Sequence, residues 1–150
     1  MTAHATRPYT AYAGIMGTFV GGLAVAGALA HVRDRDARDY DALDLVVLGL
    51  ATFKAARTIS RDDVTSFLRE PFTEDDEPVE TGDLKQAIGE LVTCSRCVGT
   101  WAAAGLGSAQ ILAPRFGRLL TWTLAAGAAN DWLQAGFAAL SHKANQLERR

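Results

Sequence analysis

Two cysteines with short spacing are the residues of this 150-residue sequence that most directly suggest chemistry. Cys94 and Cys97 are its only thiols, and Arg96 lies between them. At the start of a helix, unpaired backbone N–H groups, the helix dipole and a nearby cation stabilise the first thiolate, as a redox pair requires. No thioredoxin-like alternation of strands and helices surrounds the pair. The simplest interpretation is a packed corner where a loop enters a helix, with redox chemistry as an alternative.

A metal site is a second alternative for these cysteines. Structural zinc takes four ligands, usually cysteine or histidine. His142 could add a third ligand, or two chains could each donate one cysteine pair across a dimer. A lone C-x-x-C lacks the second ligand pair that would complete a zinc site, so we expect no resident cofactor. If a metal does bind, zinc is the one to test. The sequence has no Ser-His-acid set, phosphate-binding glycine loop or zincin motif, which favours a protein without enzymatic activity.

Asp131, beside Asn130, is the one charged residue in the segment 119–140. An ionisable group inside a membrane helix is costly and needs a partner, for which Lys54 or Arg57 is available if their segment also crosses. We interpret Asn130 and Asp131 as a polar clamp between helices. A small transporter or channel subunit that uses Asp131 is a weaker alternative.

Four further charged residues suggest a structural network in the segment 60–97. We expect Asp62, Asp63, Arg69 and Glu90 to form ion pairs that tie this loop to a short amphipathic helix preceding the cysteines. Exposed pairs contribute about 0–1 kcal/mol each, so they would fix geometry more than stability. Such a surface would suit a cytoplasmic partner or lipid headgroups.

The elements expected to hold these residues are helices long enough for a bilayer. Residues 10–30 carry no charge, and as a helix they would rise roughly 30 Å, the thickness of the hydrocarbon core. Gly17 and Gly21 form a G-x-x-x-G pair suited to close helix packing. Arg7 and the Ala28–Ala30 ending also resemble a cleaved signal peptide, but the apolar run is longer than a signal core.

The second half of the chain predicts a transmembrane hairpin, with spans at 98–113 and 119–140 joined by a basic turn. Residues 42–59 add a span if Lys54 and Arg57 snorkel; otherwise this helix lies on the membrane surface. The sequence therefore predicts an all-α integral membrane helical bundle, one domain over residues 1–150 with three or four transmembrane helices. A soluble alanine-rich bundle is the competing interpretation. Residues 10–30 and 98–113, however, lack the polar stripe of a soluble amphipathic helix.

Lysine and arginine counts predict the orientation. With four spans, ten basic residues lie on the side of the segment 60–97 and the C-terminus, against five on the other side. With three spans the split is twelve against three. Both topologies place the segment 60–97 and the C-terminus in the cytoplasm.

Two stretches, LGLATFKAARTISRDDVTSFLREPF (48–72) and AIGELVTCSRCVGTWAAAGLG (87–107), resemble a bacterial membrane family catalogued as domain of unknown function 1360. The resemblance covers roughly residues 45–110 and implies a bacterial integral membrane protein, sometimes linked by name to sporulation, with no established activity. We expect a structural or scaffolding role in the inner membrane, with membrane lipid and a homo-oligomer or other membrane proteins as partners. The net charge of −2 gives no case for nucleic acid.

Overall fold

The computed structural model describes residues 7–35 and 40–148, and they are mostly helical, which confirms the all-α expectation. Four long helices and one shorter helix carry the fold: α1 (Tyr9–Val32), α2 (Ala42–Arg61), α4 (Leu84–Thr93), α5 (Ser95–Leu112) and α6 (Pro114–Glu148). Between α2 and α4 lie short turns of helix, η2 (Asp63–Thr65), α3 (Ser66–Arg69) and η3 (Glu70–Phe72), and a hairpin of β1 (Thr73–Glu74) and β2 (Glu77–Pro78).

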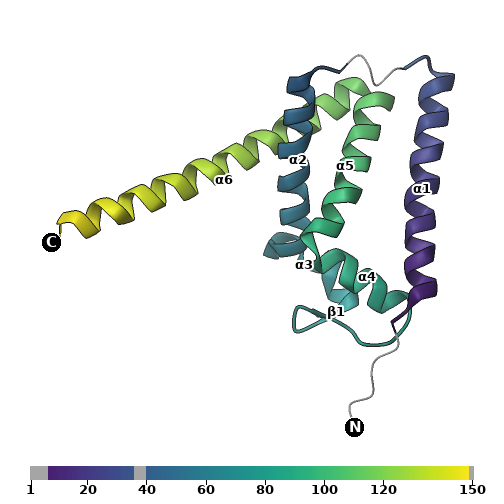
Figure 1. The fold of residues 1–150 in the computed structure, drawn as a ribbon, viewed down its shortest axis with the longest axis horizontal. Coiled ribbons are helices and arrows are strands. Elements are labelled where there is room, and N and C mark those ends of the chain that lie inside the picture. Colours follow the sequence, from purple (N-terminus) through teal and green to yellow (C-terminus); the bar gives the residue numbers. More distant parts are fainter. Residues whose placement is uncertain (1–6, 36–39, 149–150) are drawn as a thin grey trace, which may run out of the picture.

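Helices α1, α2 and α5 stand side by side (Figure 1). The start of α1, the end of α2 and the start of α5 lie at one end of this group, together with α3, α4 and the hairpin (Figure 1). At the opposite end, α5 turns into α6, which packs across α2 and then extends away from the other helices (Figure 1). The loop between α2 and α4 is thus gathered beside the cysteine corner.

Local sequence signals set most helix ends. The carboxylate of Asp41 accepts the backbone N–H of Asp44 at 2.8 Å, and Asp44 reaches back to the N–H of Asp41, which makes a capping box at the start of α2. Asp83 caps α4 by accepting the N–H groups of Lys85 and Gln86. The acidic residues between α3 and α4 form the hairpin of β1 and β2. Its turn residues Asp75 and Asp76 have positive φ, which aspartate tolerates better than most residues.

The predicted basic turn at 114–118 is wrong. Ala113 alone separates α5 from α6, and Pro114 is the first residue of α6. Proline suits this position because the first N–H groups of a helix have no intrahelical partner. Helix α6 then continues without interruption to Glu148, past the end of the predicted span at 119–140. The two helices are therefore joined by a tight corner, and the rest of α6 diverges from α5 (Figure 1).

The core is built from small residues, and many large apolar side chains face outward. Val47, Ala51, Leu106 and Ala125 form the central buried cluster between α2, α5 and α6. Large apolar residues of the long helices remain exposed, among them Val20, Val25, Leu45, Leu119, Leu133 and Phe137. Extended apolar surface of this kind marks a face that contacts protein or lipid.

Among the described residues, α1 is the one helix long and apolar enough to cross a membrane by length and composition. Its most apolar 18-residue stretch has a mean hydropathy of 1.8, and only 6% of that stretch is buried. Helix α2 falls short because Lys54, Arg57 and Arg61 dilute its apolar run. Polar residues interrupt the apolar stretches of the other two long helices: Arg96 and Gln110 in α5, and Arg118, Asn130 and Asp131 in α6.

Candidate functional site

An ion pair links two helices through residues 77 positions apart in the chain. Lys54 Nζ on α2 donates to Asp131 Oδ2 on α6 at 2.9 Å, and the two side chains are 25% and 37% exposed. The lysine stem passes beside Gly127, where a Cβ would be in ordinary van der Waals contact with Lys54 Cε at 3.5 Å. Of the two partners expected for Asp131, the structure selects Lys54. Asn130 is exposed, and its side chain makes no hydrogen bond within the described residues.

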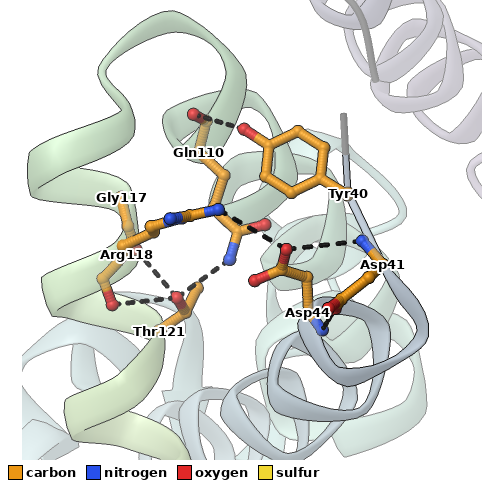
Figure 2. A network of polar contacts seen from close by, with 7 residues as sticks. All are labelled: Tyr40, Asp41, Asp44, Gln110, Gly117, Arg118 and Thr121. Carbon is orange, nitrogen blue, oxygen red and sulfur yellow. Dashed lines mark hydrogen bonds and ion pairs between the residues drawn. The ribbon is translucent and has the colours of Figure 1, made fainter. Parts of the chain in front are cut away.

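A second polar network, which sequence reasoning missed, joins the start of α2 to the corner between α5 and α6 (Figure 2). Gln110 is 3% exposed and Thr121 is fully buried, and Gln110 Nε2 donates to Thr121 Oγ1 at 2.9 Å. The Thr121 hydroxyl donates to the carbonyl of Gly117 at 2.9 Å. Gln110 is the one amide side chain in an otherwise small and apolar segment, and this is the signal that could have revealed it.

The rim of this network is charged. Arg118 Nη2 lies 3.6 Å from Asp44 Oδ2, so the carboxylate that completes the capping box of α2 also faces α6. The Tyr40 hydroxyl donates to the backbone carbonyl of Gln110 at 2.7 Å (Figure 2). The network therefore connects three helices at the end of the bundle opposite the cysteines.

The cysteine pair lies where α4 ends and α5 begins. Cys94 is the N-cap of α5, and its sulfur accepts the backbone N–H of Cys97 at 3.3 Å. The hydrogen bond from the Cys97 thiol, then that from the backbone N–H, lowers the pKa of Cys94, with a smaller contribution from Arg96. The same thiol hydrogen bond and burial raise the pKa of Cys97 to about 11. The arrangement favours a single thiolate on Cys94, as the first cysteine of a redox pair requires.

His142 does not join the cysteines. Within residues 7–35 and 40–148, no group of three or more histidine, cysteine or acidic side chains is placed to hold a metal ion. His142 Nε2 instead lies 2.8 Å from Gln146 Nε2, one turn further along α6. The reason is the unbroken length of α6, whose C-terminal half leads away from the other helices (Figure 1). A zinc site shared between two chains stays a prediction.

The expected ion-pair network of the loop is not what the described residues form. Arg69 is 6% exposed, and its Nη1 donates to the carbonyls of Ile59 at 2.9 Å and Asp62 at 3.1 Å. It therefore binds the end of α2, where the last helical carbonyls lack partners. The Asp62 and Asp63 carboxylates form no ion pair with Arg69.

Glu90 serves a different contact. Its carboxylate accepts Gln86 Nε2 at 2.9 Å and the Tyr12 hydroxyl of α1. Seven residues along α1, the ring of Phe19 meets that of Trp101 edge to face, with centroids 5.1 Å apart. These two contacts hold the first half of α1 against α4 and α5.

Gly17 and Gly21 make no close contact with the other described residues, since a Cβ at either position would meet none of them within 4 Å. They lie roughly half a turn from Tyr12 and Phe19, because successive residues turn by about 100° around a helix. The small face of α1 thus points away from the rest of the described chain.

Comparison with known proteins places these features in a family. The profile of a family described as "Protein of unknown function (DUF1360)" matches residues 47–137. "Sporulation protein YjcA" of Bacillus subtilis (strain 168) is 33% identical over 112 residues, covering 61% of this chain and 95% of that protein. No solved structure matches the chain.

Proposed function

This chain belongs to the DUF1360 family of proteins of unknown function, and we propose that it is a multi-pass bacterial inner-membrane protein with a structural role in an oligomer. The observation that carries the proposal is α1, which has an uncharged apolar stretch long enough to span a bilayer and yet is largely exposed, with only 6% of that stretch buried. In water such a helix would leave a large apolar surface unsatisfied, whereas in a bilayer lipid and neighbouring helices cover it.

The arrangement of the helices supports four crossings. The start of α1, the end of α2 and the start of α5 lie at one end, as expected if α1 and α2 each cross the bilayer (Figure 1). That end carries the basic residues Arg57, Arg61, Lys85 and Arg96. The positive-inside rule assigns it, with the segment 60–97 and the C-terminus, to the cytoplasm.

The ion pair between α2 and α6 fits this placement. A charged residue within a membrane is tolerated when it pairs inside the bundle, and Lys54 is the partner of Asp131. Because the pair is closed between two helices, it supports a polar clamp more than an ion pathway, which would need several such groups.

The small face of α1 is the surface proposed for self-association. Gly17 and Gly21 lie on the side of α1 opposite its contacts with α4 and α5, so a second copy can approach them closely. Contact between glycine faces brings backbones together and lets weak van der Waals attractions add up where lipid offers no hydrophobic driving force.

Replacing both Gly17 and Gly21 by leucine is expected to weaken the oligomer about tenfold or more, since the added side chains separate the helix backbones. Chemical crosslinking in isolated membranes, after an alkaline carbonate wash, measures both membrane insertion and association. Gly27→Leu is the matched control, because Gly27 is an exposed glycine of α1 that lies away from the Gly17–Gly21 face. Release of the wild type by carbonate would contradict the membrane placement, and equal crosslinking of wild type and double variant would contradict this interface.

The cysteine corner supports a second function, thiol–disulfide exchange at the cytoplasmic surface. The supporting observation is the lowered pKa of Cys94 at the start of α5. In such a reaction the Cys94 thiolate attacks a partner disulfide, one partner sulfur leaves as a thiol, and Cys97 then displaces the second. The two cysteines lose two electrons and two protons, which the partner disulfide takes up as two thiols.

In the wild-type protein, where the thiol hydrogen bond between the two cysteines is intact, limiting iodoacetamide is expected to alkylate Cys94 about tenfold faster than Cys97 at pH 7. The pKa of Cys94 is lowered, so its thiolate persists at pH values where an ordinary thiol is protonated, and is lost only as pH falls through that lowered pKa. Mass spectrometry of the alkylated protein over a pH series measures both rates. If the two cysteines had equal alkylation rates and equal midpoints in the pH series, the cysteine corner would be a packing feature only. If the pair stayed reduced in cells exposed to a disulfide oxidant, thiol–disulfide exchange would be excluded.

A further inference from the structure

A cavity of about 360 Å³ opens between α2 and α5, at the end of the bundle that carries the cysteines. Its walls differ in character. Phe53 and Ala56 of α2 and Gly99 of α5 line an apolar part, where the two helices lie close enough that a Cβ on Gly99 would be 3.8 Å from Ala56 Cβ. Three arginines, Arg57, Arg61 and Arg96, line the rest.

The three guanidinium groups have no carboxylate partner in the described part of the chain. None of them forms an ion pair or a side-chain hydrogen bond there. Arg57 and Arg61 are four residues apart on α2, a spacing at which like charges repel on a helix. Arg96 adds a third positive charge from the first turn of α5, whose N-terminal dipole has the same sign. An anion placed among them would relieve this repulsion.

Two hydroxyl groups beside the arginines also lack partners. The Thr52 hydroxyl is buried, lines the cavity and has no hydrogen-bond partner. Ser95 also lines the cavity, and its hydroxyl makes no hydrogen bond within the described residues. A buried polar group without a partner is unfavourable, so the Thr52 hydroxyl indicates that the cavity is completed by a ligand with oxygen acceptors. The half-buried Ser95 hydroxyl is available to the same ligand.

We propose that this cavity binds an anionic phospholipid, with its phosphate among Arg57, Arg61 and Arg96 and an acyl chain along the apolar wall. Arginine can bind phosphate oxygens through two parallel hydrogen bonds. With three guanidinium groups lining one cavity, more than one arginine can bind the same phosphate group. Free phosphate would leave the apolar wall of Phe53, Ala56 and Gly99 without a contact, whereas the acyl chain of a lipid would pack against it. This inference rests on the proposed membrane placement, which sets the arginines at the cytoplasmic leaflet, where anionic lipids gather.

Native mass spectrometry of the full-length protein in detergent tests the site with dioleoyl phosphatidylglycerol, dioleoyl phosphatidylcholine and inorganic phosphate as separate probes. We expect phosphatidylglycerol to bind about tenfold or more tightly than phosphatidylcholine, and to remain bound when inorganic phosphate is added. The triple variant Arg57→Gln, Arg61→Gln, Arg96→Gln should lose this preference. The charge-matched control Arg33→Gln, Arg35→Gln, Arg115→Gln removes three arginines from the opposite end and should keep it.

Two further variants keep the test decisive if the triple variant does not fold. Arg96→Gln alone, on the exposed first turn of α5, should weaken phosphatidylglycerol binding severalfold, and Gly99→Leu should do so without a change in charge by filling the apolar part. Equal binding of both lipids by a protein that remains in carbonate-washed membranes would overturn the lipid site alone. Displacement of the lipid by inorganic phosphate would overturn the lipid as ligand, and release of the protein by carbonate would overturn the membrane placement first.

Discussion

Replacing Lys54 by methionine is expected to destabilise the protein in a bilayer by about 3–5 kcal/mol, because it leaves the Asp131 carboxylate uncompensated away from water. Asp131→Asn should cost less, since Lys54 lies nearer the end of its helix and its long side chain can snorkel toward the interface. The double variant Lys54→Met, Asp131→Leu should recover most of the stability, because two apolar side chains of similar volume replace the pair. Unfolding in mixed micelles with increasing denaturing detergent measures all three.

The size of this effect also tests where the pair lies. In water, with side chains 25% and 37% exposed, the same ion pair would contribute about 0–1 kcal/mol. A loss within that range for Lys54→Met in lipid would contradict the membrane placement of the pair. Asn130→Leu is the matched control, since Asn130 is the exposed neighbour of Asp131 and its side chain makes no hydrogen bond within the described residues. A measured ion flux that disappears in Asp131→Asn, with assembly intact, would favour the transport alternative over the clamp.

Gly117→Ala is expected to destabilise the corner between α5 and α6 by about 1–3 kcal/mol. A Cβ at this position would lie 2.5 Å from backbone atoms of Ala109 and Gln110, and backbone cannot rotate out of the way as a side chain can. The two helices would have to separate, which also strains the buried hydrogen bond between Gln110 and Thr121. Thermal unfolding in detergent, followed by the loss of the monodisperse peak in size-exclusion chromatography, measures the change.

Gly105→Ala provides the control for this substitution. Gly105 lies in the middle of α5, and a Cβ there would meet nothing within 4 Å, so alanine should leave stability unchanged or raise it slightly. If Gly117→Ala were as stable as Gly105→Ala, the close approach of the two helices at the corner would be wrong.

Much of the architecture follows from signals that act over a few residues. The all-α class was expected from the sequence, and the Asp83 cap of α4 and the short elements between Pro71 and Pro78 are local features of the same kind. These features depend on backbone hydrogen bonds within one or two turns and on the missing N–H of proline, so neighbouring residues suffice to determine them. The two quoted stretches identified the family for the same reason, because their spacing is a local pattern.

The polar contacts between helices required the tertiary structure. The sequence offered Lys54 and Arg57 to Asp131, and only the packing of α2 against α6 selects the lysine. Arg69 was expected to bind carboxylates, yet it caps carbonyl groups at the end of α2, since the chain turns back there and buries its guanidinium.

The corner between α5 and α6 shows the same division. Pro114 and Gly117 together suggested a turn, but proline fits the first turn of a helix, and glycine at 117 is explained by the backbone it touches on α5. By itself, the sequence determined that this chain forms helices, where several of them end and which family it belongs to. The tertiary structure decided which distant side chains meet, because such contacts depend on crossing and close approach of helices that residue spacing does not encode.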